Sequence, residues 1–146
     1  MKLWVKFLLI TFILGIPAFV LGPMIWTPSQ DAKPTSGQLP FFIFLSLVEA
    51  LLFGFGVAFI ICSWSLVKKD SNQSKNITTA AFISLAWLLV SWWPHDNLHR
   101  HNAMHMQGIL YIEYGFHMTS IVAAIILSYY FFNLLKDNAQ KAESIE

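Results

Sequence analysis

The five histidines of this 146-residue chain all lie between Trp92 and His117. Imidazole is the commonest metal ligand in proteins, and histidine is the side chain that ordinarily titrates near neutral pH. The same stretch holds two of the eight carboxylates of the chain, Asp96 and Glu113. Nitrogen and carboxylate donors together suit zinc, copper(II), iron or nickel. The segment therefore predicts a metal site, with copper, zinc or iron as the expected ion.

Four of these histidines have the spacing of a helical metal site. If segment 94–107 is a helix that begins at Pro94, with Gly108 as a hinge, residues four apart lie on adjacent turns of one face. Two H-x-x-x-H pairs then share one arc, and each pair can reach one ion as in helical zinc sites. Asp96 and Arg100 point to the other side of the helix. The two pairs are His95 with His99 and His101 with His105.

Two ionisable residues interrupt apolar segments at the same expected depth in a membrane. Glu49 lies 19 residues before Lys68, and His117 lies 19 residues before Lys136. At 1.5 Å per residue, both stand about 28 Å above these lysines, near the outer edge of a hydrocarbon core about 30 Å thick. Glu113 lies one turn beyond His117 on the same helix face. All three are therefore expected to converge with the histidines on one outward-facing pocket, because ionisable groups in spans usually face the protein interior and mark functional sites.

The predicted ligand set combines these histidines and carboxylates. Methionine thioethers in the same stretch (Met104, Met106 and Met118), together with an oxidising outer compartment, tilt the expectation slightly toward copper, although methionine is also common filler in apolar helices. The structural alternative is a Glu49–His117 pair that only joins two helices, beside a solvated polar loop. The expected metal ligands are His95, His99, His101, His105, Glu113 and His117, with Glu49 and Asp96 as supporting or helix-pairing groups.

The rest of the chain has the composition of a membrane protein. Hydrophobic residues make up 56% of it and charged residues 12%, against about 25% charged in soluble domains. A transmembrane helix needs about 20 mostly apolar residues. We expect an all-α integral membrane four-helix bundle that forms a single domain over 1–146, with room for a short interfacial helix between spans three and four. The spans are predicted at about 5–26, 41–67, 77–93 and 109–135, with an outward His-rich segment at 94–107.

The distribution of basic residues predicts the orientation. If the spans alternate in direction, seven lysines fall on one side, and only Lys33 and Arg100 fall on the other. Short cytoplasmic loops carry an excess of basic residues. Both termini are therefore expected in the cytoplasm, the His-rich segment outside, and the first span uncleaved in a multi-pass protein of the cell (cytoplasmic) membrane. The seven are Lys2, Lys6, Lys68, Lys69, Lys75, Lys136 and Lys141.

Other features of the sequence narrow the range of possible sites and partners. Cys62 is the only cysteine, which excludes an internal disulfide and a cysteine metal cage. The net charge of +1, without a basic block, gives no indication of nucleic-acid binding. Glycines in the first two spans predict close helix packing. These are Gly15, Gly22, Gly54 and Gly56.

Two functions remain open at this point, and whether the protein is an enzyme stays open with them. The first is a redox-related membrane protein that binds a metal at the outer boundary. The second is a non-catalytic accessory subunit of a larger membrane oxidoreductase or monooxygenase complex, with the bilayer and other membrane subunits as partners. Bis-histidine haem is disfavoured because only the fourth span carries a histidine. A proton path is disfavoured because no charged residue continues inward below Glu49 and His117.

Overall fold

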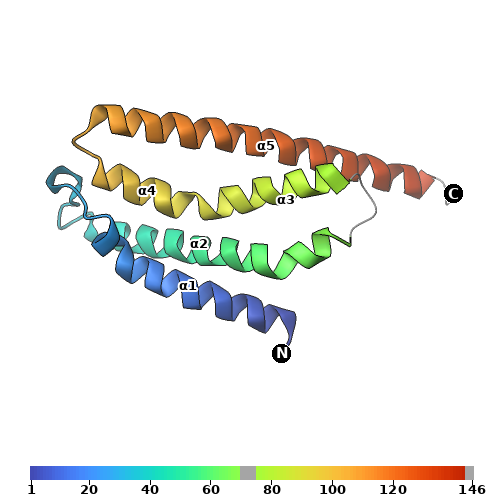
Figure 1. Cartoon of the computed structure of the whole chain (residues 1–146), viewed down its shortest axis with the longest axis horizontal. Helices are drawn as coiled ribbons and strands as arrows, with labels where there is room; N and C mark the ends of the chain where they lie inside the picture. Colours follow the sequence, from blue (N-terminus) through green and yellow to red (C-terminus); the bar gives the residue numbers. More distant parts are fainter. Residues whose placement is uncertain (70–74, 144–146) are drawn as a thin grey trace.

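The computed structural model describes residues 1–69 and 75–143, and this part of the chain folds entirely into helices and their connections. The helices run side by side along one long axis (Figure 1). The start of α1 and the end of α5 lie at one end of the structure, and the α1–α2 and α4–α5 connections lie at the other. The elements are α1 Leu3–Ile25, the 3₁₀ turn η1 Gln30–Ala32, α2 Leu39–Val67, α3 Lys75–Val90, α4 Trp92–His101 and α5 Met106–Glu143.

Three of these helices, α1, α2 and α5, are long and apolar enough to cross a membrane. The bent pair α3–α4 makes a fourth crossing segment if it is counted as one span. The predicted all-α class is confirmed, and so is the presence of helices that can span a membrane. The helix predicted between spans three and four corresponds to α4, which continues directly from α3 rather than standing apart from it.

The break between α3 and α4 has its cause at Pro94. The two helices meet at Ser91 at an angle of 41°. Proline has no N–H to donate to the carbonyl four residues earlier, which here belongs to Val90, and its ring collides with that carbonyl. The backbone hydrogen bonds resume with His95 N–H donating to Ser91 O at 3.1 Å. The third span therefore bends one turn before Pro94, whereas the sequence placed its end at Trp93–Pro94.

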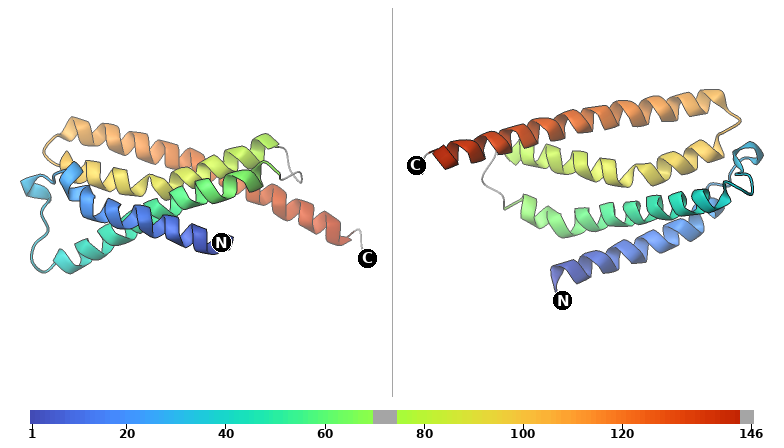
Figure 2. Two further views of the ribbon diagram at one scale, coloured as in Figure 1. Left: turned by 60° about the horizontal axis from the view of Figure 1, so that its bottom comes forward. Right: turned by 180° about the vertical axis from the view of Figure 1, so that it is seen from behind.

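The helices form an open row. Among the described helices the substantial contacts are those of α1 with α2, α2 with α3, and α3 with α5, while α4 contacts α2, α3 and α5. The view from behind shows the same succession of neighbours (Figure 2, right). The best-buried residues are small: Ala50 and Ala58 have no exposed surface, and no large side chain is fully buried in this part of the chain. This packing is typical of membrane helices, where small residues line the contacts and large apolar residues face lipid.

Glycine allows the closest of these contacts. A Cβ atom on Gly54 of α2 would collide with Thr11 O and would lie 2.8 Å from the backbone nitrogen of Gly15 in α1. A Cβ on Gly56 would lie 2.6 Å from Val90 Cγ1 in α3. The glycines of α2 thus face both neighbouring helices, and the close packing predicted from the sequence is confirmed at these positions.

We predict that Gly54→Ala destabilises the protein by about 1–3 kcal/mol, because the added methyl group overpacks a contact between two backbones. Gly115→Ala is the matched control, since a Cβ there meets no described atom within 4 Å. Alanine is also the better helix former, so this control should not lose stability. Thermal unfolding in detergent, followed by the loss of helical circular dichroism, measures both variants. Equal stability of the two would show that the α1–α2 contact is looser than described.

Candidate metal centre

Four side chains of metal-ligand type meet where α4 faces the start of α5. His95 and His99 lie one turn apart in α4, and Glu113 and His117 lie one turn apart in α5. Glu113 Oε1 contacts His99 Nε2 and lies 3.4 Å from His95 Nε2. The other carboxylate oxygen of Glu113 lies 2.9 Å from His117 Nδ1. One carboxylate is thus shared by three imidazoles, an arrangement we call the His/Glu cluster.

The donor atoms in this cluster are close enough to hold one ion. One donor atom from each of His95, His99 and Glu113 lies within 4.8 Å of the other two. Zinc–nitrogen bonds of about 2.0–2.1 Å place the donors of a tetrahedral site about 3.3 Å apart. Small rotations of these side chains would therefore bring the three donors onto one ion. His117 can join as a fourth ligand or orient the carboxylate from its other oxygen.

His95 is held by aromatic packing and has an unused donor atom. Its ring stacks on Phe116 with the centroids 3.9 Å apart, and Trp92 meets it edge-on at 6.4 Å. Its Nε2 atom is buried and has no hydrogen-bond partner among the described residues, because the 3.4 Å contact with Glu113 does not satisfy it. An unsatisfied buried nitrogen is costly. A metal ion at the cluster would supply the missing partner.

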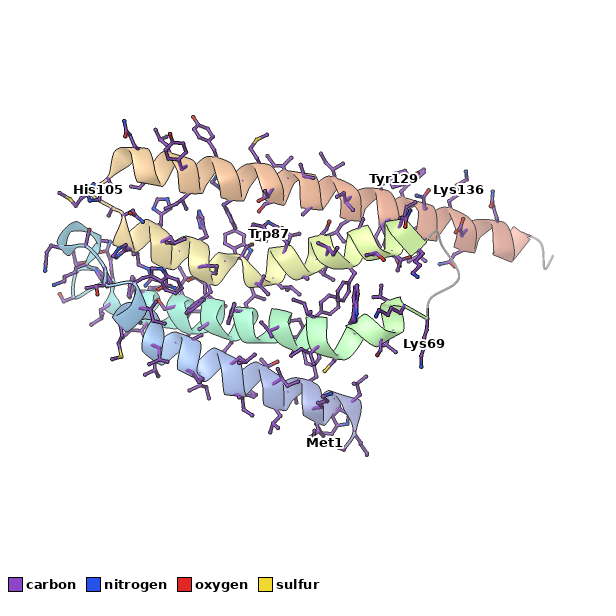
Figure 3. All side chains as sticks on the ribbon, in the orientation of Figure 1. Met1, Lys69, Trp87, His105, Tyr129 and Lys136 are labelled. Carbon is purple, nitrogen blue, oxygen red and sulfur yellow. The ribbon has the colours of Figure 1, made fainter. Side chains whose placement is uncertain are left out.

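The other two predicted histidines lie apart from the cluster, because His101 faces another side of α4 and because α4 is shorter than the predicted 94–107 helix and ends before His105. Asn102 ends it, with its side-chain amide donating to Leu98 O at 2.9 Å. His101, the last residue of α4, lies with Nδ1 2.9 Å from Thr27 O in the α1–α2 connection. His105 is exposed in the turn to α5, at one extremity of the structure (Figure 3). The second H-x-x-x-H pair therefore does not lie on one helix. Gly108, expected as a hinge, lies within α5.

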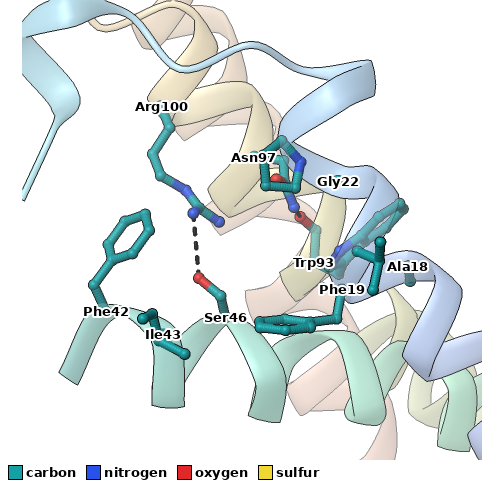
Figure 4. Close-up of a pocket in the computed structure, with 11 residues that line it drawn as sticks. Ala18, Phe19, Gly22, Phe42, Ile43, Ser46, Trp93, Asn97 and Arg100 are labelled. Carbon is teal, nitrogen blue, oxygen red and sulfur yellow. Dashed lines mark hydrogen bonds between the residues drawn. The ribbon is translucent and has the colours of Figure 1, made fainter. Parts of the chain in front are cut away.

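Glu49 and Asp96 belong to a second polar group on the opposite face of α4. Arg100 Nη2 lies 2.5 Å from Asp96 Oδ2 and 3.9 Å from Glu49 Oε2. Nη1 of the same guanidinium donates to Ser46 Oγ in α2 at 3.2 Å (Figure 4). Glu49 is only 8% exposed and its Oε2 has no hydrogen-bond partner among the described residues, so Arg100 is the cation that faces this buried carboxyl group, at the distance of a long ion pair. We call Glu49, Asp96, Arg100 and Ser46 the arginine group.

The prediction that Glu49 and His117 line one pocket is therefore wrong, because α4 lies between Glu49 on α2 and His117 on α5. The structural alternative, a Glu49–His117 pair, is not observed either: Glu49 lies beside Arg100, and His117 lies beside Glu113. Depth in the membrane, which the sequence prediction used, does not say which helix lies between two residues. The prediction omits Ser46, although its three-residue spacing from Glu49 puts both on one face of α2.

Comparison with protein families, with curated proteins and with solved structures finds no match to this chain. The chemistry of the two groups therefore rests on their own geometry.

We predict that Arg100→Met destabilises the protein by about 3 kcal/mol, because removing one partner of a buried ion pair leaves a charge uncompensated. Arg100→Met combined with Glu49→Leu should recover part of that loss, since it removes the stranded carboxylate as well. Thermal unfolding of the two variants beside the wild type gives the comparison. If the double variant were no more stable than the single one, Glu49 would not depend on Arg100 for its charge balance.

Proposed function

We propose that this protein is a membrane protein that binds a transition-metal ion at His95, His99 and Glu113, with His117 as a further ligand or orienting group. The observation that carries the proposal is the convergence of these donors, which come from two helices, on one carboxylate. The buried, unpartnered Nε2 of His95 supports it. A purely structural ion pair would need one imidazole for one carboxylate, whereas this carboxylate is surrounded by three.

The donor set narrows the choice of ion. Imidazole and carboxylate ligands suit copper(II), zinc and iron(II), and copper(II) generally binds such sites more tightly than the other two. Met104 and Met118 are 65% and 60% exposed. Neither methionine is buried beside the cluster, so the structure gives no support to a thioether ligand. The proposed ion is therefore a divalent transition metal of intermediate softness, and copper and zinc are the first ions to test. Such an ion would act as a Lewis acid, or as a redox centre in the case of copper, if one coordination position stays open.

The second candidate function, an accessory subunit of a membrane oxidoreductase or monooxygenase complex, is favoured by the place of α5 at the edge of the row. Its substantial contacts with described helices are those with α3 and α4. The side chain of His117 is 58% exposed, so the cluster is open on that side. A neighbouring subunit seated there would shield the ion and could supply a ligand. In that case the isolated chain would bind the metal weakly.

The proposed orientation places the cluster near the outer surface of the cell membrane. Lys69 and Lys136 lie toward one end of the structure and His105 at the other, so the lysine-rich and histidine-rich ends are separated along the helix axes (Figure 3). Basic residues concentrate on the cytoplasmic side of membrane proteins. This supports cytoplasmic termini and an outward-facing cluster in a multi-pass protein.

We predict that the full chain, purified in detergent and loaded with copper or zinc, retains about one ion per molecule after passage through a desalting column. His99→Ala and Glu113→Gln should each weaken binding by at least about 10–100-fold, the loss measured when even a supporting residue of a metal site is removed. Elemental analysis gives the stoichiometry, and titration against a chelator of known affinity gives the dissociation constant and the identity of the preferred ion.

The matched controls are His101→Ala and His105→Ala, which remove a histidine from the same segment but not from the cluster. Both should retain the metal at the wild-type affinity. Loss of metal in all four variants would point to a diffuse histidine-rich loop rather than the cluster. Absence of stoichiometric metal in the folded wild-type chain, with recovery only in a co-purified complex, would favour the accessory-subunit function.

The orientation gives a separate prediction. A chelator that cannot cross the bilayer should strip the ion from right-side-out membrane vesicles, because the cluster is proposed to lie at the outer boundary. The same chelator should leave the ion in place in sealed inside-out vesicles until a detergent is added. The measured quantity is protein-bound metal after the vesicles are washed. Stripping from the inside-out preparation alone would reverse the proposed topology.

A further inference from the structure

A cavity of about 360 Å³ lies on the opposite face of α4 from the His/Glu cluster, between α1, α2 and α4. Its volume falls in the range of about 300–1,000 Å³ typical of small-molecule sites. Most of its wall is apolar, and its polar residues come from α4 except for one serine of α2 that faces Arg100 (Figure 4). These are Ser46, Trp93, Asn97 and Arg100.

The polar end of the cavity offers hydrogen-bond donors. A guanidinium carries five N–H groups, and the described contacts of Arg100 account for three of them, through Nε, Nη1 and Nη2. Trp93 adds an indole N–H, which lies 3.6 Å from the place that a Cβ atom on Gly22 would occupy. Because Gly22 has no side chain, α1 can pass close to this N–H. A ligand with acceptor oxygens would accept hydrogen bonds from these N–H groups.

The charged groups beside the cavity favour a neutral ligand. The guanidinium of Arg100 already lies beside the two carboxylates of Asp96 and Glu49. An anionic headgroup would add a negative charge beside a guanidinium that already faces two carboxyl groups, and burying that extra charge is unfavourable. A neutral carbonyl or hydroxyl oxygen accepts from the free N–H groups without this cost.

The walls and the rim indicate a ring that enters from the bilayer. Phe19, Phe42 and Trp93 line the cavity, and Trp93 is fixed between Trp26 and Phe53 at centroid distances of 5.0 and 4.8 Å. Aromatic walls favour a flat ring held by stacked or edge-on contacts. At the rim, Val20 is 57% exposed on the outside of α1. In a membrane that surface faces lipid, so an apolar tail can continue into the bilayer.

We propose that this cavity binds the ring headgroup of a membrane-soluble quinone, with a carbonyl oxygen at Arg100 and Trp93. The proposal is independent of the metal site, because the cavity and the His/Glu cluster use opposite faces of α4.

The test uses the full chain in nanodiscs of phosphatidylcholine, with a photoreactive azido-benzoquinone as the probe. An unlabelled decyl-benzoquinone competes for the site, and peptide mass spectrometry locates the crosslink. We expect saturable, competable labelling of α1 and α4 peptides. Val20→Trp, which narrows the rim, should weaken competition by about tenfold or more. Ile16→Trp, one turn away at a comparably exposed position outside the cavity lining, is the matched control and should bind as the wild type does.

Metal content and helical circular dichroism of the same samples should be equal in the three proteins, which separates loss of the quinone from loss of the fold and from failure of the metal proposal. Labelling that the decyl-benzoquinone does not displace, or equal competition in all three proteins, would overturn the quinone site. Displacement of the probe by phosphatidylglycerol at concentrations where phosphatidylcholine has no effect would also overturn it, because the charge argument excludes an anionic headgroup.

Discussion

The missing backbone donor of Pro94 determines how the polar half of this protein is arranged. Because the helical hydrogen bonds fail at this residue, α4 leaves the direction of α3 by 41° and runs between α2 and α5. A straight helix would carry its polar residues along the line of α3. The bend instead gives each polar face of α4 a neighbouring helix that holds complementary groups, as a membrane protein requires for its ionisable side chains.

Both faces of α4 meet polar groups of a neighbouring helix in this way, and the two groups of contacts differ in chemistry. On the α5 side one carboxylate is shared among three imidazoles, whose nitrogens are both bases and metal ligands. On the α2 side one guanidinium, which stays protonated in proteins, lies beside two carboxylates. The first group has the donor atoms to exchange protons for a metal ion, whereas in the second the guanidinium carries a fixed positive charge. A helix with its side chains is about 10–12 Å across, so an ion on one face and a ligand in the cavity on the other would share α4 as a common wall.

The sequence was sufficient for the apolar helices but not for the bounds of α4 or for the arrangement of the helices. Apolar runs and the positions of Pro and Gly predicted the helices and the glycine contacts, because both depend on local composition. Counting residues from Lys68 and Lys136 predicted the depth of Glu49 and His117, but it carries no information on the angle about the helix axis or on which helix intervenes. The end of α4 at His101 depends on a cap by Asn102 and on the α1–α2 connection, whose Ser29 N–H donates to Arg100 O at 3.1 Å. The helix thus ends before His105, and His101 faces Thr27 O of the α1–α2 connection instead of the cluster.

The positions of the charged residues along the spans argue for a function confined to one side of the membrane. Between Glu49 and Lys68, and again between His117 and Lys136, the sequence contains no Asp, Glu, Lys, Arg or His. Carrying an ion or a proton across the hydrocarbon core requires polar groups along the way, because an unpaired charge there is expensive. The His/Glu cluster and the arginine group both lie at the same end of these spans, around α4. If these helices span the membrane as proposed, the metal site and the cavity would both lie near one boundary of the bilayer.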